Sequence, residues 1–183
     1  HGLTERKKTV YQIGERVICG NKGVCSVEQI TTLNIPGVDK GRRYYILKPL
    51  YMASSTVYIP LDNADNVMRR ALEREEVEQL IEKLPALDPI PIANEKFLEQ
   101  EYKNYLRTDR CEEWVRIVKT VLERQKKRLV QGRKLTSVDS RYYKTALDYL
   151  CGEFASALEM DKECAEEYIK GLLEETVTEG SNS

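Results

Sequence analysis

The spacing of hydrophobic and polar positions changes near residue 72 of this 183-residue chain. Before that point, short runs of β-branched and aromatic residues are separated by Gly, Asn, Pro and Ser, as in a small antiparallel sheet. In one run, Val57 and Ile59 share a face and Tyr58 points the other way. The pattern predicts a small, strongly bent antiparallel sheet or barrel. We expect its strands at residues 16–19, 24–32, 43–49, 56–59 and 67–70.

After residue 72, apolar residues recur at the three- and four-residue spacing of amphipathic helices. Asn94 is a suitable N-cap, and both Asp109 with Glu112 and Thr136 with Asp139 have capping-box spacing. Prolines within 87–93 predict an extended connector there. We expect helices at about 72–84, 94–107, 109–132, 136–158 and 161–175.

These elements predict an α+β protein with two domains. A β domain spans 9–71, a helical domain spans 72–176, and a polar tail at 177–183 is expected to be disordered.

Apolar stripes identify the expected helical core. Core packing of Trp114 is favoured over a role as a ligand contact or DNA wedge, because it falls in phase with Ile117, Val118, Val121 and Leu122. The apolar residues of this helix also include Leu129. Phe97 is likewise expected on the same side as Tyr102.

Charge is balanced overall but not locally. The 29 Lys and Arg residues face 30 Asp and Glu residues, so any nucleic-acid role depends on local clusters. The segment 119–134 contains one acid, Glu123, among these cations: Lys119, Arg124, Lys126, Lys127, Arg128, Arg133 and Lys134. It is either a binding patch or a solvated helix end, where the macrodipole favours cations. A second basic group, which includes Lys96 and Lys103, lies along the helix expected after Asn94.

Catalytic groups are scarce. His1 is the only histidine, and the five cysteines contain no C-x-x-C pair. The segment Gly132-Arg-Lys-Leu-Thr lacks the strand and upstream glycine of a phosphate loop. We therefore expect no enzymatic activity, cofactor, metal or small-molecule substrate.

No apolar run approaches the roughly 20 residues of a membrane span, and no basic-then-apolar leader is visible. We expect a cytoplasmic protein with no membrane partner.

The ordered segments of the first domain resemble the CarD family of bacterial transcription regulators. These proteins share an RNA-polymerase-interacting domain with the transcription-repair coupling factor. The carrying segments are Ile13-Gly-Glu-Arg-Val-Ile18, Asn21-Lys-Gly-Val24, Val27-Glu28, Tyr45-Ile-Leu-Lys48 and Val57-Tyr-Ile-Pro-Leu-Asp-Asn-Ala64. In the second half, Asp109, Trp114-Val-Arg-Ile-Val118, Leu122-Glu-Arg124 and Cys151-Gly-Glu153 fall in the order of the family's helical domain.

The resemblance implies a Tudor-like β barrel that docks on the β subunit of RNA polymerase. It also implies a helical domain that contacts promoter DNA near the upstream edge of the melted region and modulates open-complex stability. Such a protein associates with the nucleoid through polymerase, and its DNA contact is weak alone and not sequence-specific.

Two positions depart from the family pattern. Family members use barrel arginines for polymerase contact, and the matching positions are Leu33 and Tyr58, which predicts a more apolar interface. Family members also insert a Trp side chain into the minor groove as a wedge. The matching position falls near Asn94, where this chain has no aromatic residue, and Ile90 or Ile92 in the connector is a weak substitute.

The resemblance and the charge pattern together define two sets of site residues. The expected polymerase contacts are Leu33, Val57, Tyr58 and Ile59. The expected DNA contacts are Ile92, Asn94, Lys96, Lys103, Lys126, Lys127, Arg128, Arg133 and Lys134.

Two binding alternatives stay open at this point. A polymerase-bound adaptor would use the helical domain to bind a protein in place of DNA. A Tudor-like reader of modified peptides would need an aromatic cage. The candidate cage residues are Tyr44, Tyr45, Tyr51 and Tyr58.

Overall fold

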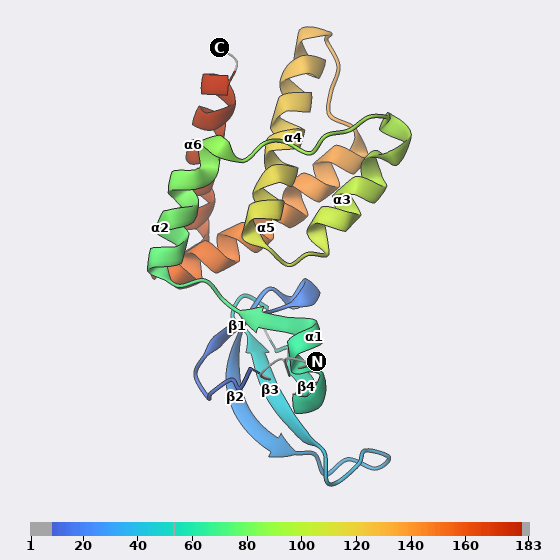
Figure 1. The fold of residues 1–183 in the computed structure, drawn as a ribbon, viewed down its shortest axis with the longest axis vertical. Coiled ribbons are helices and arrows are strands. Elements are labelled where there is room, and N and C mark those ends of the chain that lie inside the picture. The colour runs from blue at the N-terminus through green and yellow to red at the C-terminus, as the bar shows by residue number, and fades with distance from the viewer. Residues whose placement is uncertain (1–8, 53, 181–183) are drawn as a thin grey trace, which may run out of the picture. The chain divides into compact units, whose positions relative to one another are not determined.

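The computed structural model describes residues 9–52 and 54–180, with side chains up to residue 176 (Figure 1). The chain divides between Ala71 and Leu72 into two compact units. The first unit contains an antiparallel sheet and the second is helical, so the protein is of the α+β class.

The β unit is a five-stranded antiparallel sheet with the strand order β4-β3-β2-β1-β5. The first three strands have the predicted bounds, and the last two begin one residue later than predicted. The strands are β1 (Arg16–Cys19), β2 (Val24–Thr32), β3 (Arg43–Pro49), β4 (Val57–Pro60) and β5 (Met68–Arg70).

One face of the sheet forms the core of this unit. Val17, Val27 and Leu47 are buried there. The backbone N–H of Tyr11 donates to the Tyr45 hydroxyl at 3.2 Å, and the two rings meet edge to face with centroids 5.7 Å apart. The alternation of apolar residues thus produces the buried face that it predicted.

The expected barrel is not closed. Its two terminal strands, β4 and β5, do not pair with each other, and the sheet keeps both edges. The turn η2 (Leu61–Asn63) and the helix α1 (Ala64–Val67) connect them, and Ala64 enters the core. β5 has three residues and pairs with β1 on one edge, while its other edge pairs with no strand of the described chain.

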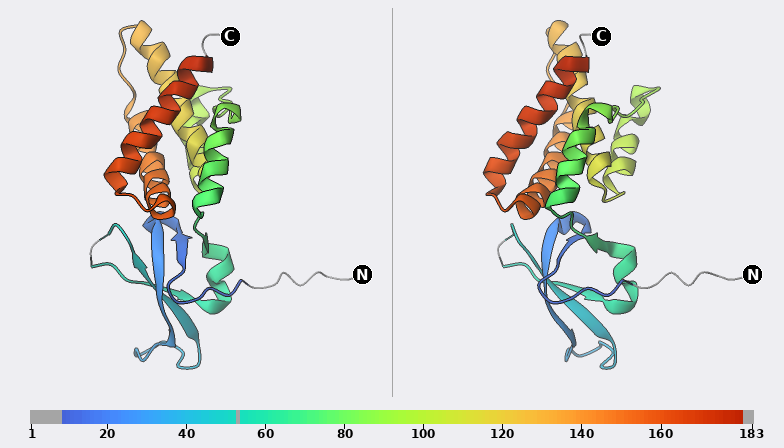
Figure 2. Two further views of the ribbon diagram at one scale, coloured as in Figure 1. Left: turned by 90° about the vertical axis from the view of Figure 1, so that its left-hand side faces the viewer. Right: turned by 60° about the vertical axis from the view of Figure 1, so that its left-hand side comes forward.

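The helical unit contains five α-helices and two 3₁₀ turns among its described residues. They are α2 (Arg74–Lys83), η3 (Leu84–Ala86), η4 (Glu95–Phe97), α3 (Leu98–Leu106), α4 (Cys111–Val130), α5 (Ser137–Leu158) and α6 (Lys162–Gly180). α4 packs against α3, α5 and α6 (Figure 2). The connector 87–94 has no regular structure, as its prolines predict.

Trp114 belongs to this helical core. It is 1% exposed, and its indole N–H donates to the Leu106 carbonyl at 3.2 Å. Its ring lies beside that of Tyr149, with centroids 5.2 Å apart. The periodicity argument for core packing is confirmed.

Helix ends follow the sequence in one case and not in another. The Thr136 hydroxyl accepts the Asp139 backbone N–H at 3.1 Å, so this predicted cap is confirmed. The predicted cap at Asp109 is wrong, because Arg110 is the N-cap of α4. Asp109 has a φ of 55° and turns the chain between two helices, whereas an N-cap residue needs an extended backbone.

α6 corrects the expected tail. The helix continues to Gly180, past the end expected at residue 176. No Gly or Pro lies between Gly171 and Gly180, so the backbone has no residue that would stop the helix earlier. Residues 181–183 of the predicted tail lie outside the described residues.

A fully buried carboxylate connects three helices of this unit. Asp139 of α5 accepts the Tyr102 hydroxyl of α3 at 2.7 Å and the Thr136 hydroxyl at 2.9 Å. The Arg124 guanidinium of α4 donates its Nε to both oxygens, at 3.0 and 3.2 Å. Arg124 Nη1 also reaches Glu95 at 2.7 Å, which attaches η4 to α4. Buried charge is stable only with such partners.

We expect Asp139→Asn to destabilise the helical unit by about 2–4 kcal/mol, because it leaves Arg124 without its buried counter-charge. Urea unfolding followed by Trp fluorescence measures this, since Trp114 is the only tryptophan and lies in the helical unit. Glu166→Gln breaks an exposed pair with Lys170 and is the control, with a change below about 1 kcal/mol. Equal changes in the two variants would contradict the structural role of Asp139.

Candidate functional site

The outer edge of the sheet is strand β4. It pairs with β3 on one side, and as the end strand its other side is not paired with any strand of the described chain. Val57 and Ile59 are partly buried against the core. Tyr58 points the opposite way and is 47% exposed. The predicted alternation is therefore present, and of these three residues Tyr58 is the one that a partner can reach.

Tyr58 lies in a cross-strand row on the outer face of the sheet. It is opposite Ile46 of β3, and Ile46 is opposite Gln29 of β2. Leu33 follows directly after the end of β2 and is half-buried. The row is partly apolar and carries no charge, as expected from the residues at Leu33 and Tyr58.

The four candidate cage residues do not all share one face of the sheet. Tyr45 is 2% exposed and lies in the core, whereas its neighbour Tyr44 has the opposite orientation and stacks under the Arg42 guanidinium. Tyr45 therefore cannot join Tyr44 or Tyr58 in a cage on the outer face.

The basic segment predicted for DNA contact lies at the distal end of α4. Buried positions on this helix stop at Val121. Lys126, Lys127, Arg133 and Lys134 are exposed, and Arg128 is half-buried. The end of α4 and the loop after it extend past the neighbouring ends of α3 and α5 (Figures 1 and 2). No Asp or Glu occurs between Gln125 and Thr136, so the segment itself carries only positive charges.

The turn after α4 is held by backbone bonds. The Arg133 N–H donates to the Arg128 carbonyl at 2.8 Å, and the Gly132 N–H donates to the Leu129 carbonyl at 3.0 Å. This is a Schellman motif, and Gly132 has the positive φ of 70° that it requires. Arg128 Nε also donates to the Lys134 carbonyl at 2.8 Å. Arg128 is thus a structural residue of the turn as well as a cation.

Two cations of the predicted basic run belong to the fold instead. Lys119 is 5% exposed and donates to the carbonyls of Leu84 and Leu87, the latter at 2.7 Å. Burial lowers the pKa of its ammonium group. Arg124 is held by Asp139 and Glu95. Neither residue is available to a partner.

The turn η4 brings other predicted DNA contacts near α4. Asn94 caps it by accepting the Lys96 N–H at 3.0 Å, as predicted. Glu95 bonds to Arg124, and the Arg124 bond, together with the nearby charge of Arg128, lowers the pKa of Glu95. Exposed Lys96 therefore lies on η4, which the bond between Glu95 and Arg124 attaches to the C-terminal half of α4.

The remaining predicted DNA contacts are placed less favourably. Ile92 is half-buried in the connector, and Ile90 is 4% exposed. Lys103 lies farther along α3 and pairs with Glu99 at 3.8 Å. The exposed cations are thus those at the end of α4 and Lys96, and DNA contact stays a prediction for the whole set.

Sequence reasoning missed three exposed apolar residues. Phe97 is 55% exposed, Leu129 is 74% exposed and Val130 is 86% exposed. The expected burial of Phe97 and Leu129 is wrong. Phe97 ends the 3₁₀ turn, out of phase with Leu98 and Tyr102 on α3, and Leu129 lies beyond the last buried turn of α4. The spacing of apolar residues along α4 does not show where the neighbouring helices end, so it could not predict that Leu129 is exposed.

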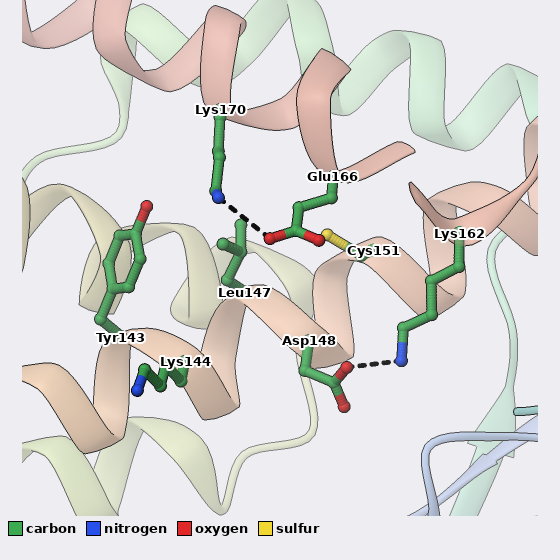
Figure 3. A pocket seen from close by; sticks show the side chains of 8 residues that line it. All are labelled: Tyr143, Lys144, Leu147, Asp148, Cys151, Lys162, Glu166 and Lys170. Carbon is green, nitrogen blue, oxygen red and sulfur yellow. Dashed lines mark hydrogen bonds and ion pairs between the residues drawn. The ribbon is translucent and has the colours of Figure 1, made fainter. Parts of the chain in front are cut away.

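A surface hollow of about 390 Å³ lies between α5 and α6 (Figure 3). Lys162 of α6 pairs with Asp148 of α5 across it, and Lys170 pairs with Glu166 one turn away on α6. Burial raises the pKa of the Cys151 thiol to about 12, so this cysteine is not a nucleophile near neutral pH. The hollow is therefore lined by two ion pairs and a protonated thiol.

Within residues 9–52 and 54–180, no group of three or more His, Cys, Asp or Glu side chains could hold a metal ion. No helix of the described chain is long and apolar enough to cross a membrane.

Comparison with protein-family models matches residues 11–72 to the CarD-like/TRCF RID domain. The matched segment contains all the strands of the β unit, including β4. Comparison with curated proteins gave no match.

The cysteines give a direct test of burial. Burial raises the pKa of Cys25 and Cys151 to about 12, and Cys19 and Cys111 are also buried. We expect a thiol reagent at pH 8 to modify exposed Cys164 rapidly and the other four only on unfolding. Mass spectrometry of the native protein checks this, with Cys164→Ser as the control. Rapid labelling of a buried cysteine would show that its unit opens readily.

Proposed function

We propose, on the premise that residues 11–72 form a CarD-like/TRCF RID domain, that this protein is a regulator of bacterial transcription. The domain is of the RNA polymerase-interacting type, and we infer that it docks on the β subunit of the polymerase. The helical unit then contacts promoter DNA and changes the lifetime of the open complex. The family match carries the first part, and the basic end of α4 supports the second.

The edge of β4 is the proposed polymerase contact. An unpaired edge strand can accept a strand from another chain, which gives affinity through main-chain hydrogen bonds. Tyr58 adds an exposed aromatic side chain on this edge strand, and half-buried Leu33 directly follows the end of β2. Tyrosine is enriched among the residues that dominate protein interfaces. Val57 and Ile59 contribute by holding β4 on the core.

The proposed DNA contacts are the exposed cations at the end of α4 with those on η4. Lys126, Lys127, Arg133 and Lys134 would neutralise phosphates, and Lys96 would extend the contact. Exposed Phe97 lies three residues after Asn94, near the position that the resemblance assigns to the family's wedge. Side chains of this kind can stack on an unpaired base or enter a kinked base step.

Docking explains how weak DNA contacts become useful. Phosphate contacts alone give dissociation constants on the order of 10⁻⁴–10⁻⁶ M at physiological salt. Attachment to polymerase raises the effective concentration of the helical unit near the promoter. The proposed role needs no catalysis and no cofactor, and it places the protein in the bacterial cytoplasm with polymerase.

We expect Tyr58→Ala to weaken binding to an isolated polymerase β lobe by about 1–3 kcal/mol, because it removes an exposed aromatic anchor. Calorimetry with purified lobe measures the change. Tyr51→Ala is the matched control, since Tyr51 is 41% exposed on the same unit but lies outside β4. Wild-type affinity in both Tyr58→Ala and Leu33→Ala would place the contact elsewhere.

A charge-reversal variant tests the DNA contact. Arg128 is left intact because it holds the turn, and the triple variant is Lys126→Glu, Lys127→Glu and Arg133→Glu. We expect the slope of log K against log salt to flatten by about two to three units, since about three phosphate contacts are lost. Salt-dependent fluorescence anisotropy on duplex DNA measures this slope.

The functional measurement is open-complex lifetime on a supercoiled promoter. We expect wild type to change the lifetime and the triple variant to lose that effect while it still binds the β lobe. The control compares two single variants: Lys127→Glu reverses one cation of the proposed contact, and Lys144→Glu reverses one exposed cation of α5 outside it. If the triple variant acts like wild type, the cations are only a solvated helix end. A wild type that binds polymerase but affects no open complex would favour a protein-binding adaptor.

A further inference from the structure

Two consecutive aliphatic side chains are exposed at the end of α4. Leu129 and Val130 have 74% and 86% of their surface exposed, and the proposed phosphate contacts do not use them. The Gly132 and Arg133 N–H groups donate to carbonyls of α4, so the backbone that follows both side chains is already ordered. A partner can therefore bury them at little cost in conformational entropy.

Exposed cations surround these two side chains. Lys127 precedes them by less than one helical turn, and Arg133 and Lys134 follow them in the loop. We call these three cations, Leu129 and Val130 the tip. A protein surface that covers the tip must combine an apolar spot with several acids, because it brings its own charges within reach of the cations.

The exposed face of α6 has this combination. Its residues recur at three- and four-residue spacing along the helix, on the side opposite the buried ones. Lys170 is the only cation after Lys162 in the sequence, and it pairs with Glu166 at 3.0 Å, so the face carries net negative charge. We call this face the acidic stripe, and its defining residues are Glu163, Glu167, Tyr168, Gly171 and Glu175.

Packing within the chain does not require glycine at position 171. Gly171 lies in the interior of α6, where glycine is the least favourable residue after proline. A Cβ atom at this position would meet no heavy atom of the neighbouring described chain within 4 Å. The missing side chain lets another molecule approach the helix backbone closely. It does so one turn from Tyr168, whose ring is 42% exposed.

We propose that the tip of one molecule docks on the acidic stripe of a second copy of the same chain. Leu129 and Val130 lie over Gly171 and against the ring of Tyr168. The three cations of the tip face the acids of the stripe. The tip and the stripe are different surfaces, so the contact is heterologous and leaves a tip and a stripe open to further copies.

The acidic stripe suits the tip better than a phosphate backbone does. Phosphates supply negative charge but leave Leu129 and Val130 in water, whereas the stripe offers acids together with an aromatic ring and a glycine. The contact is small beside the roughly 1,200–2,000 Å² of a stable interface, so the association is weak and sensitive to salt.

Self-association has a consequence for the proposed function. A tip that is docked on a second copy cannot contact phosphates, so assembled molecules are withheld from DNA. Only this consequence rests on the DNA contact proposed above. The association itself is tested without DNA.

Sedimentation equilibrium of the full-length protein at low salt and increasing concentration tests the contact. We expect the weight-average mass to rise above that of the monomer, and to return to it near about 1 M salt, where the Debye length is about 3 Å. A wild-type protein that stays monomeric at every concentration would overturn the contact and leave the DNA proposal standing.

Charge reversal identifies the two surfaces. Lys127→Glu/Arg133→Glu and Glu167→Lys/Glu175→Lys should each remove most of the association, because like charges then face each other. An equal mixture of the two variants should associate again, since each reversed surface then meets a complementary one. A mixture that stays monomeric would overturn the pairing of tip with stripe.

The matched control reverses two acids outside the stripe. Glu78 and Glu82 are exposed on α2, and Glu78→Lys/Glu82→Lys changes the net charge as much as the stripe variant does. We expect this control to associate like wild type. Equal losses in the control and the stripe variant would mean that net charge alone drives association, and the contact would be rejected.

Two further variants test the apolar part. Leu129→Ala/Val130→Ala should weaken association by about three- to tenfold, because apolar burial is lost. Gly171→Leu should raise the melting temperature, since leucine favours helix, and yet weaken association by filling the gap. Loss of association in a more stable protein cannot come from misfolding. Wild-type association by Gly171→Leu would contradict the placement of the tip on this face.

Discussion

The helical unit depends on one buried carboxylate. Asp139 joins Tyr102 of α3, Arg124 of α4 and Thr136 at the start of α5, and Arg124 carries the connection on to Glu95. A charge without exposure to water needs such partners, so the positions of three helices and of η4 are set together. Because α5 begins at this carboxylate, the end of α4 continues past the core and its tip is left in solvent. The proposed DNA surface follows from the arrangement that satisfies Asp139.

The β unit depends on a different constraint, the edge of an open sheet. Closing the barrel would have paired β4 with the free edge of β5, but β5 has only three residues and pairs with β1 alone among the described strands. An unpaired edge strand is a risk for aggregation, and natural proteins keep such edges short or interrupt them with proline. β4 has four residues and ends at Pro60, which limits indiscriminate pairing. It still offers Tyr58 and a short row of backbone groups, which suits a specific partner strand better than a general one.

Ion pairing explains how an almost neutral chain has a basic end. Within the helical unit, Lys103 and Arg141 share Glu99, while Arg124 is held by Asp139 and Glu95. These ion pairs neutralise the positive charges of the cations near the core of the helical unit. The cations past residue 125 have no acidic neighbour in sequence until Asp139, and that residue is buried. These cations therefore gather at the C-terminal end of α4, next to exposed Leu129 and Val130.

The sequence by itself determined the features that arise from local periodicity and backbone chemistry. The strand alternation around Tyr58, the cap at Thr136, the glycine that ends α4 and the core position of Trp114 all follow from neighbours along the chain. The tertiary structure decided where each helix loses its neighbours and which charges become buried. Lys119 and Leu129 share one helix, yet Lys119 is buried against carbonyl groups and Leu129 is in solvent. Helical period cannot distinguish these environments, because burial depends on the length and position of the other helices.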